Sequence, residues 1–338
     1  MRSGIRILMA TLLIIALCSP VPAPAQKMKK ALNSKAGKTA FEPAVLWREP
    51  TDISRRNLFY GQGGKEHAPQ GKFSFLEEDP KGSNPKFEIQ DDQGVKWKVK
   101  LGPEAQSETA ATRLVWAVGY FTDEDYYLPE LRVEGMKKLR RGQKFVTRDG
   151  IVHGARLERH IKGEKKAGQW SWFDDRLAGT REMNGLKVMM ALINNWDLKQ
   201  SNNEVYEEQG AERRYVIADL GATFGKTGNT MTRSRNSLND YLKSKFIDRV
   251  KPQQVDFVLR SRPFFLFAFN PRYYIERTRM ERIVKEIPRS DARWIGSLLA
   301  RLSDQQIADA FRAAGYSPQE VNAFTGKVRE RIAELNKL

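Results

Sequence analysis

Three short alternating segments most constrain what this 338-residue chain can fold into. Each alternates apolar and polar residues, the period-two pattern of a strand with one buried face, and turn-forming residues separate them. The segments are 72–79 (KFSFLEED), 86–92 (KFEIQDD) and 94–102 (GVKWKVKLG), with turns at 80–85 (PKGSNP) and 91–94 (DDQG). The sequence therefore predicts a small antiparallel sheet in this region.

A helix and two more strands are predicted after this sheet. Ser107 is a candidate N-cap for a helix over 108–119 (ETAATRLVWAVG), which would end at Gly119. Strands are predicted at 130–135 (ELRVEG) and 151–160 (IVHGARLERH). Five strands and one helix would then complete the first part of the fold.

Most of the remaining chain is predicted to be helical. Apolar residues at helical spacing favour a helix over 177–195. Capping-box sequences at 303–306 (SDQQ) and 317–320 (SPQE) mark the starts of two later helices. The exception is 204–221, which indicates two strands around a polar turn that contains Gly210.

The order of these elements predicts an α+β fold with two lobes. The N-lobe, 72–160, would hold the antiparallel sheet and one helix, and the C-lobe, 161–338, would be mainly helical. A ligand would bind in the cleft between the lobes. The aromatic stretch at 264–274 (FFLFAFNPRYY) is expected to pack in the core, with a membrane-surface or partner patch as the alternative.

Residues 1–25 have the composition of a secretory signal peptide. Arginines precede an apolar run at 7–18 (ILMATLLIIALC), and small residues lead to a candidate cleavage site before Gln26. The sequence predicts cleavage near Ala25 and a secreted or periplasmic mature chain. Lipid attachment through Cys18 is less favoured, because a large leucine precedes that cysteine.

The mature chain is predicted to begin with a lead-in segment at 26–71, loosely ordered over its Lys-rich part at 26–55. No later segment is apolar for long enough to cross a membrane, so no transmembrane segment is expected there. Cleavage would also remove the only cysteine of the chain, which excludes disulfide and thiol chemistry.

The formal net charge of the full chain is +17. Such a surface attracts anions, so an anionic surface or polymer is a candidate partner: lipid headgroups, nucleic acid, acidic glycans or phosphorylated substrates. The charge can equally serve solubility alone, and both interpretations stay open because the basic residues are spread along the chain.

The residues with the strongest chemical signal lie in NNWDLKQSNN (194–203) and DLGATFG (219–225). Asp197 and Asn202 are five positions apart on a predicted loop, and Asp219 follows an apolar run. The chain has only three histidines and one cysteine. Oxygen ligands in small number suit Mg²⁺ or Mn²⁺ held together with phosphates, and not zinc or copper.

Phosphoryl transfer from a nucleotide uses a lysine for the phosphates, an acid that holds this lysine, an Asp as base, and an Asn and an Asp for the metal. These residue types occur here in that chain order. The chain resembles the protein-kinase-like superfamily, with WKVK at 97–100 in the place of V-A-I-K and WDLKQSN at 196–202 in the place of R-D-L-K-x-x-N. It is more similar to atypical branches. KLGPEAQSETAATRLVWAVG resembles the Lys-to-Glu step of HipA-type kinases, and DLGATFG is similar to the metal-Asp segment of secreted kinases of the Golgi casein-kinase type.

The resemblance implies a nucleotide site for ATP. Lys100 would bind the phosphates and Glu108 would pair with Lys100. Lys98 shares the strand face of Lys100 and is the alternative phosphate ligand. The chain lacks a G-x-G-x-x-G loop, and the short loop that contains Gly82 and Ser83 would contact the phosphates instead.

The resemblance also implies the catalytic and metal residues. Asp197 would be the catalytic base and Lys199 would contact the γ-phosphate. Asn202 and Asp219 would bind Mg²⁺ or Mn²⁺, and Asn203 is an alternative to Asn202. The catalytic-loop His and Arg of the family are replaced by Asn and Trp in this chain.

We therefore predict an exported atypical kinase-like phosphotransferase that uses ATP and a divalent metal to phosphorylate a hydroxyl acceptor, which the sequence leaves unidentified. Two alternatives remain. One is a catalytically inactive pseudokinase-type binding protein with the same fold, and the other is a cationic envelope protein that binds anionic polymers. Convergence of the predicted ligand residues in one cleft would count against the envelope protein.

Overall fold

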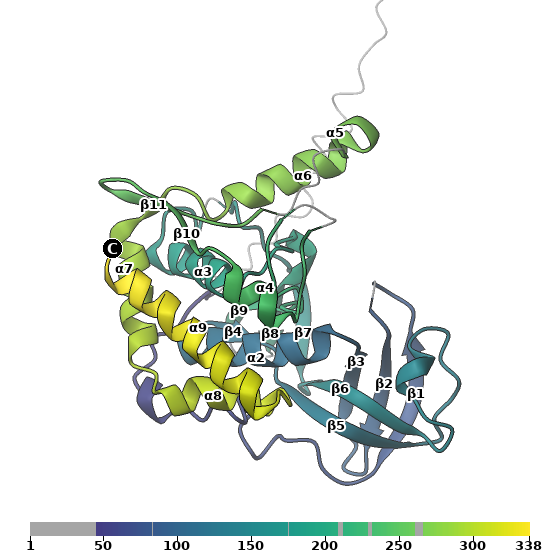
Figure 1. Ribbon diagram of the computed structural model, residues 1–338. Helices are drawn as coiled ribbons and strands as arrows, with labels where there is room; N and C mark the ends of the chain where they lie inside the picture. Colours follow the sequence, from purple (N-terminus) through teal and green to yellow (C-terminus); the bar gives the residue numbers. More distant parts are fainter. Residues whose placement is uncertain (1–44, 83, 175, 209–211, 229–231, 261–265) are drawn as a thin grey trace, which may run out of the picture. The chain divides into compact units, whose positions relative to one another are not determined.

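The structure is a computed structural model, and it describes residues 45–82, 84–174, 176–208, 212–228, 232–260 and 266–338. All of them belong to one structural unit, Pro43–Leu338. The predicted signal peptide, the first part of the lead-in segment, Ser83 and Gly210 lie outside the described residues. The described chain has a mixed α+β fold, as predicted (Figure 1).

Five strands of the N-terminal half form a closed barrel, where the sequence predicted a small antiparallel sheet. In barrel order these strands are β1 (Phe73–Asp79), β2 (Lys86–Asp91), β3 (Lys96–Leu101), β6 (Ile151–Arg159) and β5 (Asp125–Glu134). Neighbours pair antiparallel, except that β1 and β5 pair in parallel at Phe73 with Val133 and at Ser74 with Glu134. This short parallel pairing closes the barrel and joins strands that are far apart in the sequence.

The alternation in the sequence decides which side chains fill the barrel. Phe87, Trp97 and Val99 are buried in its interior. Lys98 and Lys100 occupy the alternate positions of β3 and line a cavity outside this core. The strand that the sequence marked most clearly therefore also carries the lysines of the candidate site.

The helix after β3 begins four residues earlier than predicted. It is α2 (Glu104–Ala117), and Pro103 occupies the N-cap position. Proline suits the first turn of a helix because its ring fixes φ near the helical value. Ser107 is consequently inside α2 and not at its N-cap, and its hydroxyl donates to the carbonyl oxygen of Gly221 (2.8 Å). Gly119, where the helix was predicted to end, follows the C-cap with a positive φ of 101°.

The hairpin predicted at 204–221 is present and belongs to a four-stranded sheet. Its strands are β8 (Asn203–Glu208) and β9 (Arg213–Ile217). β9 pairs in parallel with the short β4 (Phe121–Thr122), and β8 pairs antiparallel with β7 (Glu164–Gln169). β7 was not predicted, because its sequence EKKAGQ is polar and lacks the apolar alternation of a half-buried strand.

The rest of the described chain is largely helical, as predicted. Its helices are α3 (Arg181–Leu192), α4 (Leu238–Lys243), α5 (Leu266–Phe269), α6 (Pro271–Arg282), α7 (Arg289–Ala300), α8 (Asp304–Ala313) and α9 (Pro318–Asn336). Both predicted capping boxes are present, with Ser303 at the start of α8 and Ser317 at the start of α9.

A third sheet was not predicted, and its strands are β10 (Ile247–Val250), β11 (Gln254–Phe257) and β12 (Ile287–Pro288). Three 3-10 turns complete the described elements: Ile53–Arg55, Gln143–Phe145 and Gln200–Asn202.

The described part of the lead-in segment, 45–71, is not loosely ordered. Leu46, Ile53 and Leu58 are buried in the larger hydrophobic core. The side-chain amide of Gln306, near the start of α8, donates to the carbonyl oxygen of Ile53 (2.7 Å). A few apolar residues within a polar segment are enough to bind it to the fold.

The aromatic stretch at 264–274 does not pack in the core where the structure describes it. Phe269, on α5, is 83% exposed, Tyr273 and Tyr274 on α6 are half-buried, and the adjoining Ile275 is 63% exposed. In Figure 1, α6 extends along one edge of the helical part. Within the described ranges, no helix is both long and apolar enough to span a bilayer.

Candidate active site

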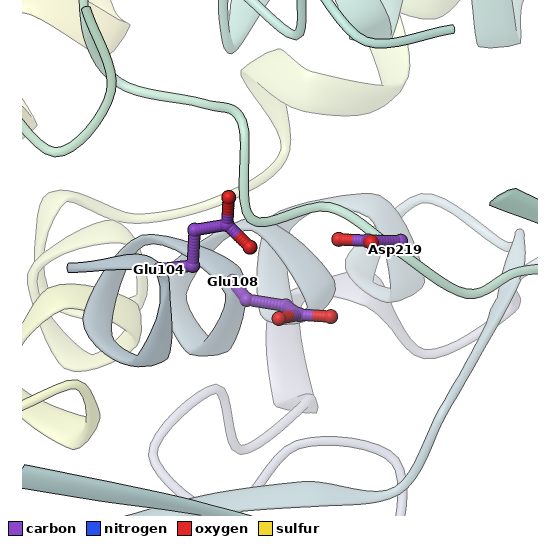
Figure 2. Close-up of side chains that lie close together, drawn as sticks. All are labelled: Glu104, Glu108 and Asp219. Atoms are coloured by element: carbon purple, nitrogen blue, oxygen red, sulfur yellow. The ribbon is translucent and has the colours of Figure 1, made fainter. Parts of the chain in front are cut away.

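Lys100 lies at the centre of the site, in contact with three carboxylates. Its Nζ is 2.7 Å from Glu108 Oε2, 3.1 Å from Asp219 Oδ1 and 3.2 Å from Glu104 Oε2. The predicted contact between Lys100 and Glu108 is therefore present. Figure 2 shows that Glu104 and Glu108 project from α2 toward Asp219, which lies on the segment after β9.

Burial and neighbouring charges set the protonation of this cluster. Burial alone would lower the pKa of Lys100, but Glu108 and Asp219 outweigh it and raise the pKa above its usual value. Burial raises the pKa of Glu108 to about 7, against the opposing effects of Arg156 and Lys100. Burial also acts to raise the pKa of Asp219, but Lys100 and the backbone N–H of Gly221 keep it below its usual value. Lys100 is therefore cationic and Asp219 anionic at neutral pH, as phosphate and metal binding require.

The β8–β9 hairpin brings Asn202 and Asp219 together. Asn202 directly precedes β8, and Asp219 follows β9 after one intervening residue. The backbone N–H of Ala218 donates to the carbonyl oxygen of Asn202 (3.1 Å), which continues the strand pairing toward both side chains. Asn202 and Asp219 line one cavity of about 160 Å³, together with Lys100 and Glu108.

Both residues offer an oxygen that could bind a cation. The Nδ2 of Asn202 donates to the carbonyl oxygen of Asp197 (2.7 Å), while its Oδ1 accepts a long bond from Ser201 (3.4 Å). The Oδ1 of Asp219 accepts from Lys100 and from the N–H of Gly221, and its Oδ2 has no hydrogen bond within the described ranges. The Asp219 side chain is 43% exposed. Accessible carboxylate and amide oxygens fit Mg²⁺ or Mn²⁺, which prefer hard ligands and retain waters or phosphate oxygens.

A second metal site among the carboxylates is disfavoured by charge. Oxygens of Glu104, Glu108 and Asp219 lie within 4.8 Å of one another, a spacing that could hold a cation. The Lys100 ammonium is within 3.2 Å of each of these side chains, and Arg156 and Arg235 also contact Glu108 and Glu104. The three acids are therefore already surrounded by cationic side chains, which disfavours a metal ion among them.

Asp197, the predicted base, is ion-paired at both oxygens. Its Oδ1 is 2.9 Å from Arg277 Nη1, and its Oδ2 is 3.0 Å from Lys199 Nζ. Neither Asp197 nor Lys199 lines the cavity that contains Asp219. Asn202 connects Asp197 to this cavity, because it lines the cavity and its side chain donates a hydrogen bond to the Asp197 carbonyl oxygen. Arg277 is buried and the Lys199 side chain is 36% exposed, so Lys199 is the cation that can leave Asp197 more easily.

The other predicted nucleotide ligands are placed differently. Lys98 Nζ is 2.7 Å from Glu158 Oε1, and Lys98 lines the same cavity as Lys100, so both lysines stay candidate phosphate ligands. Gly82 does not line the cavity, and its carbonyl oxygen accepts from Arg141 (2.6 Å). Ser83 lies outside the described residues.

Several residues of the site were missed by sequence reasoning. Among them are Lys86 and Arg156, which line the cavity, Glu104, which contacts Lys100, and Arg277, which contacts Asp197. Pro103 could have revealed Glu104, because a helix that starts at this proline includes it in the first turn. The alternation of β2 could have revealed Lys86. Nothing in the local pattern indicates Arg277, which lies 80 residues after Asp197.

No protein-family model matches the chain, and no curated protein matches it. Two similar solved structures are both kinases. The crystal structure of the proinflammatory kinase CtkA from Helicobacter pylori is 12% identical, and the match covers 80% of this chain and 97% of that chain with a TM-score of 0.45. The amicoumacin kinase hAmiN, solved with AMP-PNP, Ca²⁺ and Ami, is 11% identical over 92% of this chain and 93% of that chain, with a TM-score of 0.24. Likenesses of this size carry no argument about this chain, so its function has to be inferred from the contacts described above.

Proposed function

We propose that the chain is an atypical kinase-like phosphotransferase, which uses ATP and Mg²⁺ or Mn²⁺ to phosphorylate a hydroxyl acceptor. The observation that carries the proposal is the convergence of Lys100, Glu108 and Asp219 from three separate elements, with Asn202 in the same cavity. A paired lysine beside carboxylate and amide ligands is what the phosphates of a metal-bound nucleotide require. The barrel and α2 would form the smaller lobe of a two-lobed fold, and the helical part the larger lobe.

Each residue would have a separate task in the transfer. Lys100, positioned by Glu108, would neutralise the phosphate oxygens of the nucleotide. Asp219 and Asn202 would hold a divalent cation, which would supply positive charge to offset that of the phosphates. Asp197 would accept the proton of the acceptor hydroxyl at Oδ2, while the hydroxyl oxygen bonds to the γ-phosphorus and ADP leaves.

A pseudokinase-type binding protein is the second candidate, and one observation favours it. Both oxygens of Asp197 are ion-paired, with Arg277 and with Lys199, which leaves no free oxygen for a hydroxyl. In the phosphotransferase, Lys199 would leave Asp197 and contact the γ-phosphate. In the pseudokinase, both pairs would persist in the nucleotide-bound protein.

The cationic envelope protein is the weakest candidate. The ligand residues converge in one cavity, and simple binding of anionic polymers does not require such an arrangement. An anionic surface or polymer as an additional partner rests on the net charge of +17 alone.

Nucleotide binding to the mature chain tests the proposal. We expect ATP to raise the thermal midpoint only when Mg²⁺ or Mn²⁺ is present, and phosphate to be incorporated into the chain itself or into one of a panel of hydroxyl acceptors.

Asp219→Asn should lose both responses, because it removes the charged metal ligand. Asp149→Asn is the matched control, since Asp149 is an exposed loop residue paired with Arg132 (3.8 Å). If Asp219→Asn responds to nucleotide as the wild type does, Asp219 is not a metal ligand. Stabilisation of the wild type without transfer would select the pseudokinase.

We also propose that the chain is exported and cleaved near Ala25, on the basis of the N-terminal sequence. N-terminal sequencing of the mature protein from its source cells should begin near Gln26. An intact Met1 on cytoplasmic material, or a lipid on Cys18, would refute this proposal.

A further inference from the structure

A second cavity of about 250 Å³ adjoins the cavity of the candidate site. Lys98, Asp123 and Glu158 line both cavities and form the boundary between them. If the nucleotide phosphates bind at Lys100 and Asp219, as proposed above, the nucleoside extends past this boundary into the second cavity. The inference below therefore rests on the proposed function.

The second cavity is unusually polar for a site that would hold a purine base. Ile161 and Val216 are the aliphatic residues among the described side chains that line it, and the other lining residues are mostly charged. Most small-molecule sites bind mainly through apolar and aromatic contacts, with a few polar groups that orient the ligand. Here the base would have to be selected by hydrogen bonds.

Most acids of the two cavities already have partners. Glu158 is 2.7 Å from both Lys98 and Arg156. Glu124 is 2.9 Å from His67 and 3.4 Å from Arg159. Glu164 pairs with Arg214, and Glu204 pairs with Lys166 and accepts a hydrogen bond from Tyr206. These side chains hold one another in position, so a ligand would have to break an existing pair to use them.

Asp123 is the exception. It lies between β4 and β5 and is half-buried, and its side chain makes neither an ion pair nor a hydrogen bond with any residue that the structure describes. Burial, together with Glu158, raises the pKa of Asp123 well above its usual value, against the effects of Arg156 and Lys98. A half-buried carboxyl group without a partner loses solvation and gains nothing in return unless a ligand supplies a hydrogen bond.

We propose that Asp123 selects the base of the bound nucleotide by hydrogen bonds to the edge of that base. A protonated carboxyl group has one acceptor and one donor. It matches adenine, whose 6-amino group donates and whose N1 accepts. An ionised carboxylate accepts only, and matches guanine, whose N1–H and 2-amino group both donate. Since the proposed function uses ATP, Asp123 would act here through its donor and its acceptor together, and the chain would prefer ATP to GTP.

Two substitutions of Asp123 separate these hydrogen-bond patterns. Asn has the donor and acceptor of a protonated Asp, and Ala has neither. The dissociation constants of ATP and GTP should be measured with Mg²⁺ for the mature wild type, Asp123→Asn and Asp123→Ala, with Asp149→Asn as the control. The thermal midpoint without nucleotide shows whether each variant is folded.

We expect the wild type to prefer ATP and Asp123→Asn to retain that preference. Asp123→Ala should bind ATP about tenfold more weakly, the loss expected when a base edge loses its hydrogen bonds. A wild type that prefers GTP would contradict this assignment.

Three outcomes would overturn the inference. If Asp123→Ala binds ATP as well as the wild type does, Asp123 does not contact the nucleotide, and the proposed function is unaffected. If Asp123→Ala weakens ATP and GTP equally, Asp123 contacts the ribose or phosphates that both share, and not the base. If the wild type binds no nucleotide in the presence of metal, the proposed function fails and this inference fails with it.

Discussion

The two ends of the candidate site pair their charges in opposite ways. At the phosphate end, the single ammonium of Lys100 contacts three carboxylates, and its side chain is only 6% exposed. At the acceptor end, the single carboxylate of Asp197 contacts two cations, Arg277 and Lys199. The first arrangement fixes a cation for the phosphates, whereas the second neutralises the residue that would act as a base.

If the proposed transfer takes place, this difference indicates which end has to rearrange first. Lys100 cannot leave without exposing buried acids to one another, so the end around Lys100 would bind phosphates without rearrangement. Asp197 can be freed at Oδ2 by the movement of the partly exposed Lys199. We therefore expect nucleotide binding and transfer to respond differently to substitutions at the two ends.

Asp197→Asn should have the largest effect on transfer, together with some loss of stability because buried Arg277 loses its anionic partner. The variant keeps Lys100, Asp219 and Asn202, so ATP should still raise the thermal midpoint in the presence of metal. Phosphate transfer should fall by about 10²–10⁴-fold, the typical contribution of a general base. For the wild type and for Asp197→Asn, the thermal midpoint and phosphate incorporation should both be measured on the same preparation. Loss of ATP binding in Asp197→Asn would show that the two ends are not independent.

Lys100→Met should cause the largest loss of stability. It removes the cation that Glu108 and Glu104 share and leaves them only Arg156 and Arg235, and breaking a buried ion pair costs up to about 3–5 kcal/mol. Urea unfolding at neutral pH without nucleotide would measure the change in the free energy of unfolding. A cost below about 1 kcal/mol would mean that the acids protonate or find other partners, and the phosphate end would not be the rigid end.

The stability of the wild type should depend on pH through Glu108. Its folded pKa of about 7 exceeds the ordinary value of 4.5, so the folded chain binds more protons than the unfolded chain between these two values. The contribution of Glu108 to the free energy of unfolding should therefore fall as pH rises through this window, by up to about 1.4 kcal/mol per pH unit. Unfolding curves of the wild type and Glu108→Gln at several pH values isolate this contribution. Parallel pH profiles for the two proteins would contradict it.

Lys199→Met should have the smallest effect on stability. Its pair with Asp197 is partly exposed, and such pairs contribute about 0–1 kcal/mol. Transfer is the informative measurement, because Lys199 is proposed to contact the γ-phosphate once it leaves Asp197. A fall in transfer with unchanged stability supports that role. An increase in transfer would instead identify Lys199 as an inhibitory cap on the base.

Much of this arrangement could be predicted from the sequence, because it follows from local periodicity. The alternation of 94–102 places Lys100 on the face opposite the buried Trp97 and Val99, and the structure has the same pattern. The polar turn between two apolar runs predicted the hairpin that brings Asn202 beside Asp219. Burial of one face leaves a periodic trace in the residues of a strand or helix, and a hairpin pairs residues that are near in the sequence.

Other features were decided by the tertiary structure alone. The pairing of β1 with β5 closes the barrel, Arg277 from α6 caps Asp197, and Asp123 lies unpaired between two cavities. Each depends on where segments far apart in the chain meet, and a contact between such segments leaves no repeat in either one. The end of β1, an arginine on α6 and an aspartate in a loop could each have packed against many other segments, so their own sequences do not identify the partner. The sequence alone therefore predicted the pairing of Lys100 with Glu108, but only the packing of distant elements determined what surrounds Asp197 and Asp123.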